Sequence, residues 1–419
     1  MTTTINNKNK KPNVPNLRFL EFQGEWEKCK VSDLLDFYST NSLSWDKLEY
    51  GTDAIQNLHY GLIHVGLPTM IDLSKDKLPN ITNGNTPKNY ELCQEGDIAF
   101  ADASEDTNEV AKAVEFYKLN GKAVICGLHT IHGRDNHQKT VVGYKGYAFS
   151  SMAFHHQIRR IAQGTKIYSI NSKNFSECYI GIPSKEEQKK IATLLRLIDE
   201  RIVTQNKIIE DLKKLKSAII ENVFDDKHSE RLQLDNVGSY IRGLTYSSND
   251  VVEHGGTLVM RSNNIVNGSL LDYNNNVVFV NKQMSAEQQL QNGDIVICMA
   301  NGSSSLVGKS SFYDGNWHSP ITVGAFCGIY RSKEPIVKWL FQTNKYRRYI
   351  WNSLQGGNGA IANLNGEDIL NMSFSIPNAP IKDTCVKMLT SVDSALENNI
   401  SLCALYTLQK QYLLRQMFI

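Results

Sequence analysis

An internal repeat is the feature that most constrains how this 419-residue chain can fold. The segment 182–200 matches the segment 376–394 at an offset of 194 residues. Because a repeat this long predicts a repeated structural unit, we expect each half to be a globular block followed by a long helix. Two upstream matches keep the same order in both halves: QEGDIAF (94–100) with QNGDIVI (291–297), and, more loosely, 163–175 with 358–369.

The last part of each half has the apolar spacing of a coiled-coil helix. A capping-box pattern, Ser184 with Glu187 three residues later, marks the start of the first helix. Apolar residues then recur in alternating steps of four and three residues, which is a heptad seam, and the same seam follows in the second half. The residues expected at the helix–helix seam are Ile191, Leu195, Ile198, Ile202, Gln205, Ile209, Leu212, Leu389, Val392, Leu396, Asn399, Cys403, Tyr406 and Leu413.

The repeat also predicts how these helices pair. Each would extend roughly 60 Å at about 1.5 Å per residue, too far for one small domain to cover, so each needs a partner helix. The partner we expect is its own repeat, running antiparallel. Polar breaks recur at equivalent seam positions, Gln205 with Asn399 and Lys216 with Lys410, and Asp199 superposes on Asp393. We expect Gln205 and Asn399 to meet as a register-fixing polar pair; the alternative is two unrelated solvated amides.

The globular blocks contain short strand signals bounded by turn residues, so each is expected to be a mixed α/β domain. The predicted class is α+β, with two similar domains separated by two long antiparallel coiled-coil helices in a pseudo-two-fold repeat. The strand signals are GDIAFA, KAVICG, TLVMRS, NNVVFV and GDIVICMA. The expected boundaries are a flexible N-terminal arm (1–16), a first domain (17–183), a first long helix (184–224), a second domain (225–377) and a second long helix (378–419).

Composition narrows the class of protein. No apolar run approaches the roughly 18 residues needed to cross a bilayer, and the N-terminus lacks a hydrophobic signal core, so we expect a cytoplasmic protein without a membrane partner. The eight cysteines are scattered and form no CxxC pair, which argues against zinc ribbons and disulfide frameworks. The net charge of +2 means that any positive surface for nucleic acid must be local.

Two further motifs suggest a nucleotide site and a metal site, but their spacing does not support either site. GSSSLVGKS (302–310) ends like a phosphate-binding loop, but five residues separate its glycines where the motif requires four, so we expect no nucleotide there. His129, His132 and His137 cluster near Cys126 without a typical zinc spacing. We therefore predict no metal site. No methyltransferase motif or persuasive nuclease constellation is present either, so no catalytic residue is assigned.

The chain resembles the specificity subunit of type I restriction-modification systems, and the resemblance covers nearly its whole length. Its individual motifs are moderately specific, but their duplicated order is highly specific. One departure is that the second helix entry, IPNAPIKDT, lacks the glutamine found at Gln188. The resemblance rests on LRFLEFQGEWEKCKVSDL (17–34), Ile182-Pro183 with Gln188, IATLLRLIDERI (191–202), LQGGNGAIANLNGEDI (354–369), and GDIVI followed by the Gly308-Lys309 loop.

The resemblance implies two target-recognition domains, each reading half of a split, asymmetric DNA site. It also implies two modification subunits docked on the long helices and restriction subunits that translocate DNA in the full complex. S-adenosylmethionine, ATP and magnesium would be bound by those partner subunits, and no cofactor by this chain.

Arg, Lys, Asn and Gln side chains that reach groove edges read bases, whereas contacts to phosphates supply general affinity. Ordinary solvated surface charge is the alternative for each candidate taken alone. The two arginine pairs precede the two long helices at comparable positions and rank highest for phosphate contact. The candidates are Arg134, Lys145, Arg159, Arg160 and Lys166 in the first domain, and Arg242, Arg261, Asn263, Asn264, Lys309, Arg347 and Arg348 in the second.

The function predicted from sequence is a non-catalytic DNA recognition subunit that positions modification and restriction subunits. The alternative is a coiled-coil scaffold with two adaptor domains and no DNA specificity. Salt-dependent binding to one defined duplex, lost in a scrambled duplex, separates the two. An enzyme using the loop at Lys309 is a second rival, and it would lose nucleotide binding when Lys309 is replaced by Ala.

Overall fold

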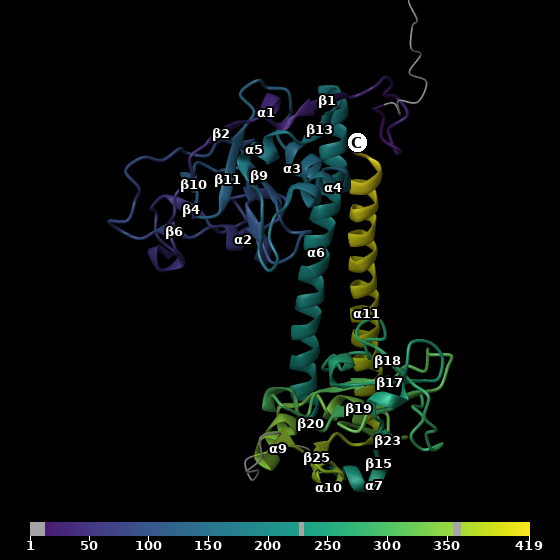
Figure 1. The fold of residues 1–419 in the computed structure, drawn as a ribbon. Helices are drawn as coiled ribbons and strands as arrows, with labels where there is room; N and C mark the ends of the chain where they lie inside the picture. Colours follow the sequence, from purple (N-terminus) through teal and green to yellow (C-terminus); the bar gives the residue numbers. More distant parts are fainter. Residues whose placement is uncertain (1–12, 226–229, 355–361) are drawn as a thin grey trace, which may run out of the picture. The chain divides into compact units, whose positions relative to one another are not determined.

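The computed structural model describes residues 13–225, 230–354 and 362–419, and the chain divides into two compact units. Unit 1 is Met1–Asn206 with Ser401–Ile419, and unit 2 is Lys207–Ile400. Each unit contains one mixed α/β module and part of each of two long helices, α6 (Lys185–Val223) and α11 (Ala379–Gln416) (Figure 1). The predicted fold class is therefore confirmed, with both sheets and helices in each half.

The first module contains a five-stranded sheet of order β2-β11-β7-β9-β5 and a four-stranded sheet of order β10-β4-β6-β3. Phe100, Phe149, Phe154 and Phe175 pack edge to face between the larger sheet and the helices α3–α5. The elements are β1 (Glu27–Lys30), α1 (Val31–Leu34), β2 (Asp36–Tyr38), β3 (Leu48–Glu49), β4 (Gln56–Leu58), α2 (Tyr60–Val65), β5 (Met70–Asp72), β6 (Asn80–Ile81), β7 (Ile98–Ala101), β8 (Ala103–Ser104), β9 (Ala113–Lys118), β10 (Val124–Cys126), β11 (Thr130–Arg134), α3 (Lys145–Phe149), α4 (Met152–Ile161), β12 (Tyr168–Ser169), α5 (Ser172–Ser176) and β13 (Tyr179–Ile182).

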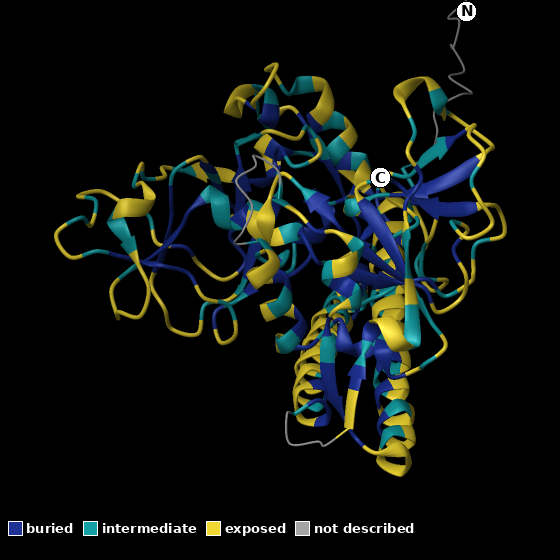
Figure 2. Cartoon of the chain, turned by 90° about the horizontal axis from the view of Figure 1, so that it is seen from below, coloured by how far each residue is buried: buried dark blue, intermediate teal, exposed yellow. Residues whose placement is uncertain are grey.

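The second module contains two four-stranded sheets, of order β15-β23-β19-β21 and β16-β18-β17-β22. In both modules the strands lie mostly in the buried colour of Figure 2, whereas the long helices keep exposed faces. The elements are β14 (Glu230–Gln233), α7 (Leu234–Val237), β15 (Gly238–Arg242), β16 (Val251–Val252), β17 (Thr257–Met260), β18 (Val278–Val280), β19 (Ile295–Cys298), β20 (Ala300–Asn301), β21 (Ser310–Phe312), β22 (Ile321–Val323), β23 (Cys327–Ser332), α8 (Val337–Leu340), α9 (Asn344–Leu354), β24 (Ala362–Asn363), α10 (Gly366–Leu370) and β25 (Ser373–Ile376).

Equivalent strand pairs recur in the two modules. The module's first and last strands pair antiparallel, β1 with β13 and β14 with β25, and the last strand leads through a proline into the long helix. The pairs β7–β11 and β19–β23 are antiparallel, and β4–β10 and β17–β22 are parallel. All five strand signals of the sequence contain an observed strand: β7, β10, β17, β18 and β19.

The start of α6 corrects one detail of the predicted capping box. The Ser184 hydroxyl accepts a hydrogen bond from the Glu187 backbone N–H at 3.3 Å, as expected. The Glu187 carboxylate, however, pairs with both Arg18 Nε and Arg18 Nη2, at 2.7 and 2.8 Å, and so ties the N-terminal segment to the helix. Gln188 is fully buried and accepts from the Val141 N–H. Its counterpart Lys382 pairs instead with Glu334, so an ion pair takes the place of the buried amide at the second helix entry.

In each unit, both long helices pack on the core of the module in that unit. In unit 1, Ile191, Leu195 and Ile198 of α6 join Leu413 of α11 in one buried cluster with the module's aromatic residues. In unit 2, α6 contributes Ile220 and Val223, and α11 contributes Cys385 and Leu389, to a cluster around Trp339. The fourteen seam residues are all buried or half-buried.

Within each unit the two helices run antiparallel, as predicted. In unit 1, Asp199 pairs with Lys410 at 2.6 Å, and further along α6 the Cys403 thiol donates to the Asn206 amide oxygen at 3.3 Å. The α11 partner number therefore falls as the α6 number rises. In unit 2, Lys216 pairs with Asp393 at 2.6 Å. The later residues Ile219 and Val223 line one cavity with the earlier residues Ile381 and Cys385.

The two ion pairs are the same pair in the repeat, because Asp199 corresponds to Asp393 and Lys410 to Lys216. Each carboxylate also accepts a hydrogen bond from an aromatic side chain of its module. Tyr147 donates to Asp199 at 2.8 Å, and the Trp339 indole donates to Asp393 at 3.1 Å. Each aspartate thus joins the two helices to the module.

Some expectations remain as predictions. The Gln205 side chain is buried and Asn399 donates to the Ala395 carbonyl of its own helix at 2.6 Å, and the contact between the two amides stays a prediction. Residues 1–12 of the expected N-terminal arm and 355–361 of the block before the second helix lie outside the described residues. Among the described residues, no helix is both long and apolar enough to cross a bilayer.

The helix ion pairs predict unequal contributions to stability. Lys216 and Asp393 are 8% and 7% exposed, whereas Lys410 and Asp199 are each 20% exposed. Lys216→Met should cost about 3 kcal/mol, because it removes one of the two lysines that bind the buried Asp393 carboxylate and leaves the Gly268 carbonyl without its lysine partner. Lys410→Met should cost about 1 kcal/mol. Urea unfolding of the full chain measures both, and equal midpoints for the two variants would contradict this ranking.

Candidate nucleic-acid interface

A buried arginine–aspartate pair occupies the same place in both modules. Arg134 on β11 donates through Nε and Nη2 to the two Asp97 carboxylate oxygens, each at 2.8 Å. Arg331 on β23 does the same to Asp294, at 2.8 and 2.7 Å. Each aspartate also accepts from the backbone N–H of the residue three positions earlier, Gln94 or Gln291. The GD turns that repeat in the sequence are therefore folded around an ion pair.

The structure buries three of the predicted DNA-contacting residues, Arg134, Lys145 and Asn264, each among its own polar partners. Arg134 has only 11% of its side chain exposed and also pairs with Glu91, so its fork is occupied inside the module. Although burial disfavours the carboxylate, hydrogen bonds from Arg134 and His132 hold the pKa of Asp97 below its usual value. The structure gives Arg134 a structural role in place of the predicted DNA contact.

Lys145 and Asn264 are corrected for the same reason. Lys145 is 4% exposed and lies 3.4 Å from Glu115, a fully buried carboxylate whose pKa is raised by burial. Glu115 also accepts from two backbone N–H groups, those of Gly143 and Gly146. Asn264 is fully buried and donates to the Asp272 and Asn275 carbonyls. Neither side chain is available to a duplex in this structure.

The remaining candidates lie at the surface. Arg159 is exposed beside Asn108 and His156, with both of which it makes hydrogen bonds. Arg261 is half-buried and donates to the Asn276 carbonyl. Their DNA contacts stay predictions. The candidates that are exposed are Arg159, Arg160, Lys166, Arg242, Asn263, Arg347 and Arg348.

The structure brings two second-module candidates together. Lys309 and Arg347 line one surface pocket, with polar groups such as Ser304 and Asn267 on one part of its wall and apolar residues such as Ile350 on the rest. Lys309 lies just before the strand β21, whereas a phosphate-binding loop of the nucleotide type leads into a helix, so the loop lacks the helix N-terminus that would hold phosphates. The two cations, with the hydroxyl and amide groups on the polar part of the wall, suit a single backbone phosphate.

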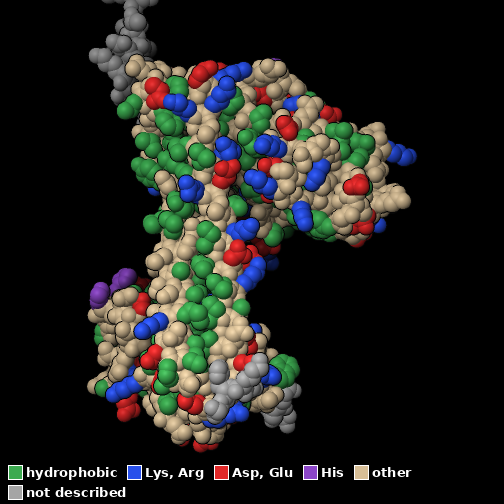
Figure 3. All heavy atoms as spheres, turned by 180° about the vertical axis from the view of Figure 1, so that it is seen from behind, with side chains coloured by type: hydrophobic (Ala, Val, Ile, Leu, Met, Phe, Trp, Pro, Cys, Tyr) green, Lys and Arg blue, Asp and Glu red, His purple; other side chains and the backbone are tan. Residues whose placement is uncertain are grey.

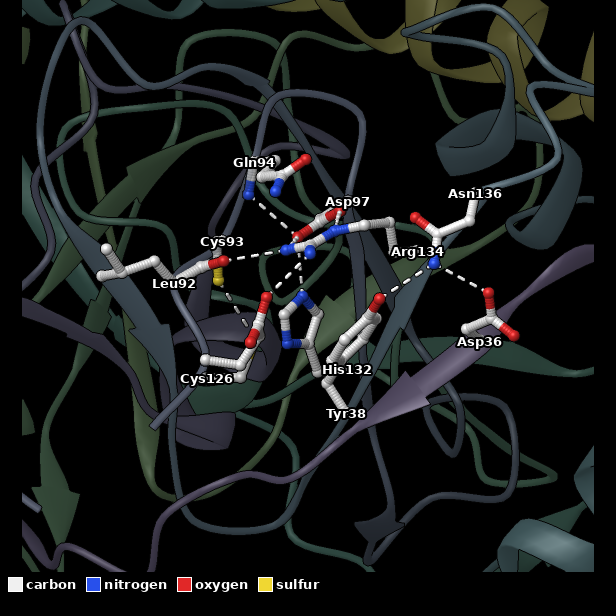
Figure 4. Close-up of polar contacts among 11 residues, drawn as sticks. Asp36, Tyr38, Leu92, Cys93, Gln94, Asp97, Cys126, His132, Arg134 and Asn136 are labelled. Carbon is white, nitrogen blue, oxygen red and sulfur yellow. Dashed lines mark hydrogen bonds and ion pairs between the residues drawn. The ribbon is translucent and has the colours of Figure 1, made fainter. Parts of the chain in front are cut away.

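A cysteine–histidine cluster in the first module is the feature that sequence spacing did not reveal. Cys93 lies before β7, Cys126 ends β10 and His132 is on β11, and the fold brings their ligand atoms within 4.8 Å of one another. Figure 4 shows this group beside the Asp97–Arg134 pair. Among the described residues it is the group with metal-ligating chemistry. The two cysteines are 33 positions apart in the sequence, a spacing that matches no motif, so only strand pairing could reveal the cluster.

The chain was compared with known proteins. The family model described as the type I restriction modification DNA specificity domain matches residues 77–214. The specificity subunit of the type I restriction enzyme EcoKI from Escherichia coli (strain K12) is 35% identical over 155 residues, 35% of this chain and 31% of that protein. The chain therefore matches about a third of the length of this relative.

Two solved structures share the fold over most of the chain. The S subunit of a type I restriction-modification system from M. genitalium superposes with a TM-score of 0.60 and 15% identity, covering 97% of this chain and 99% of that one. A chain from a study of complex assembly and conformational transition of the type I R-M system superposes with a TM-score of 0.51 and 13% identity, covering 93% and 96%. At these identities the likeness concerns the fold.

The burial of Arg134 predicts a stability defect. Arg134→Ala leaves the Asp97 carboxylate, 1% exposed, without its main partner and should cost about 3–5 kcal/mol of unfolding free energy. The exposed Arg160→Ala is the matched control and should stay within about 0.5 kcal/mol. Denaturant unfolding measures both. Unchanged stability of Arg134→Ala with weaker, less salt-dependent DNA binding would restore Arg134 as a DNA contact.

Proposed function

We propose, since residues 77–214 match the family model described as the type I restriction modification DNA specificity domain, that this chain is the DNA-reading subunit of a type I restriction-modification complex. The observation that carries the proposal is this domain match in the first module, together with a second module of the same construction in unit 2. Two similar but non-identical modules suit the reading of two non-identical half-sites. All three comparisons point to specificity proteins, so the scaffold alternative is not favoured.

In this proposal the chain works in the cytoplasm, binds double-stranded DNA with a bipartite asymmetric site and performs no catalysis itself. The exposed basic residues supply phosphate contacts, which set register and general affinity. S-adenosylmethionine would be bound by modification subunits, and ATP and magnesium by restriction subunits. Co-purification with a modification subunit, followed by mapping of methylated adenines on a genome, would identify the recognised site.

The pocket at Lys309 and Arg347 predicts a defined loss of DNA affinity. The double substitution Lys309→Ala with Arg347→Ala should weaken binding to all duplexes by a similar factor and lower the salt slope of log K by about 1, because one phosphate contact is lost. The reason is that phosphate contacts release counterions and carry no base information. Fluorescence anisotropy across a salt series, on cognate and scrambled duplexes, measures this.

The control for that experiment is Lys214→Ala, since Lys214 is exposed on α6 and paired with Glu210. It should leave the slope unchanged. An unchanged slope in the double variant as well would remove this pocket from the DNA interface. Equal binding of the unsubstituted chain to every duplex, with its partner subunits present, would contradict the proposed function itself.

An apolar face on α11 supports the assembly part of the proposal. Leu405, Leu408 and Tyr412 in unit 1 are 61%, 60% and 56% exposed, and their spacing places them on one side of the helix. Hydrophobic side chains gather along the long helices on the face shown in Figure 3. Contiguous exposed apolar surface of this kind marks interaction sites. We propose that a modification subunit covers it.

Polar substitution of this face should break assembly without unfolding the chain. Leu405→Ser with Leu408→Ser removes apolar surface from the proposed interface and should weaken modification-subunit binding at least tenfold, because each buried leucine contributes about 1.5–3 kcal/mol. Val65→Ser, at a residue 89% exposed on the first module, is the control and should bind normally. Sedimentation or size-exclusion of the mixed subunits gives the readout, and normal assembly of the double variant would rule out this surface.

A further inference from the structure

We propose that Cys93, Cys126 and His132 bind a zinc ion inside the first module. All three side chains are buried, at 6%, 2% and 0% exposure. The two sulfur atoms are 3.6 Å apart. Tetrahedral zinc–sulfur bonds of about 2.3 Å would set two sulfurs roughly 3.8 Å apart, whereas a disulfide requires about 2.05 Å. The sulfur spacing therefore suits two ligands of one ion.

The histidine has one ring nitrogen engaged and the other without a partner. Nε2 lies 2.7 Å from an Asp97 carboxylate oxygen. Nδ1 is buried and makes no hydrogen bond. A buried polar atom left unpaired costs about 1–3 kcal/mol, so its position requires an explanation. Coordination of a metal ion through Nδ1 supplies that partner.

Asp97 gives the histidine the support that metal ligands usually have. Metal-bound imidazoles commonly donate their other N–H to a carboxylate, which fixes the ring orientation and tautomer. Asp97 is itself held by the two-pronged contact from Arg134. In Figure 4 the His132 ring lies between this carboxylate and the Cys126 side of the cluster. The Asp97–Arg134 pair balances its own charge, so two thiolates would remain to balance Zn²⁺.

The second module shows that the fold does not require these polar residues. The positions 197 residues later are Leu290, Val323 and Ile329, and all three are buried in one apolar cluster. The offset is structural as well as sequential. The Cys93 N–H donates to the Val124 carbonyl at 2.8 Å, and the Leu290 N–H donates to the Ile321 carbonyl at 3.0 Å.

At equivalent positions the second module therefore packs three apolar residues, whereas the first module has two cysteines and a histidine. If packing alone decided these positions, apolar residues would serve in the first module too. Two thiolates and an imidazole favour zinc over magnesium or calcium, which prefer oxygen ligands. The fourth coordination position is left to a non-protein ligand such as water. The ion would tie the segment before β7 to β10 and β11 and so stabilise the first module.

The test is metal content and spectroscopy of the full chain. The purified protein should contain about one zinc per chain by mass spectrometry of metals. After removal of zinc under reducing conditions, Co²⁺ should bind with thiolate-to-cobalt charge-transfer absorption, and it should raise the melting temperature. Cys93→Ser, Cys126→Ser and His132→Gln should each abolish the absorption. Cys178→Ser, at a buried cysteine outside the cluster in the same module, should keep it.

Because the single variants could lose metal binding by misfolding, a triple variant tests the site independently. Cys93→Leu with Cys126→Val and His132→Ile introduces the residues of the second module, and it should fold but bind neither Zn²⁺ nor Co²⁺. The proposal is overturned if the unsubstituted chain binds no metal. It is equally overturned if the cobalt absorption survives in the triple variant, or if mass spectrometry finds Cys93 and Cys126 joined as a disulfide in the reduced-purified chain.

Discussion

In each unit one aspartate joins the two long helices to the module, and the rest of the structure depends on this contact. Asp199 binds Lys410 and Tyr147, and Asp393 binds Lys216 and Trp339. The lysine comes from the other long helix, so the pair sets how the helices align. The aromatic donor comes from the module, so the same carboxylate also fixes the module on the helices. Helix pairing and module docking are therefore one network, repeated in both units.

The modules reuse one scaffold and differ in what fills it. The Asp97–Arg134 and Asp294–Arg331 pairs hold equivalent strands with nearly identical geometry. Around them the contents diverge, most clearly where cysteines and a histidine stand in one module and leucine, valine and isoleucine in the other. A common frame with divergent interiors fits the proposal that the chain presents two related surfaces to two different DNA half-sites.

Sequence patterns correctly predicted the secondary structure wherever it follows a regular repeat of residues. The heptad spacing predicted α6 and α11 to within a few residues of their ends, and the GD turns marked β7 and β19. Patterns failed for individual charged residues in the modules, because their burial depends on which partners the fold places across strands. Arg134 and Lys145 are of residue types that commonly contact DNA. The buried carboxylates of Asp97 and Glu115 nevertheless hold them in the interior of the first module. The Glu187 carboxylate likewise pairs with Arg18 and does not take its expected capping role.

The sequence by itself determined the duplication, the long helices and their antiparallel direction, since those follow from repeat order and spacing along one chain. Tertiary structure alone decided which cations face water and which residues meet across strands. Cys93, Cys126 and His132 come together because β4, β7, β10 and β11 belong to sheets assembled from distant segments. Contacts of that kind depend on strand pairing and burial, and neither is encoded in the local spacing of residues.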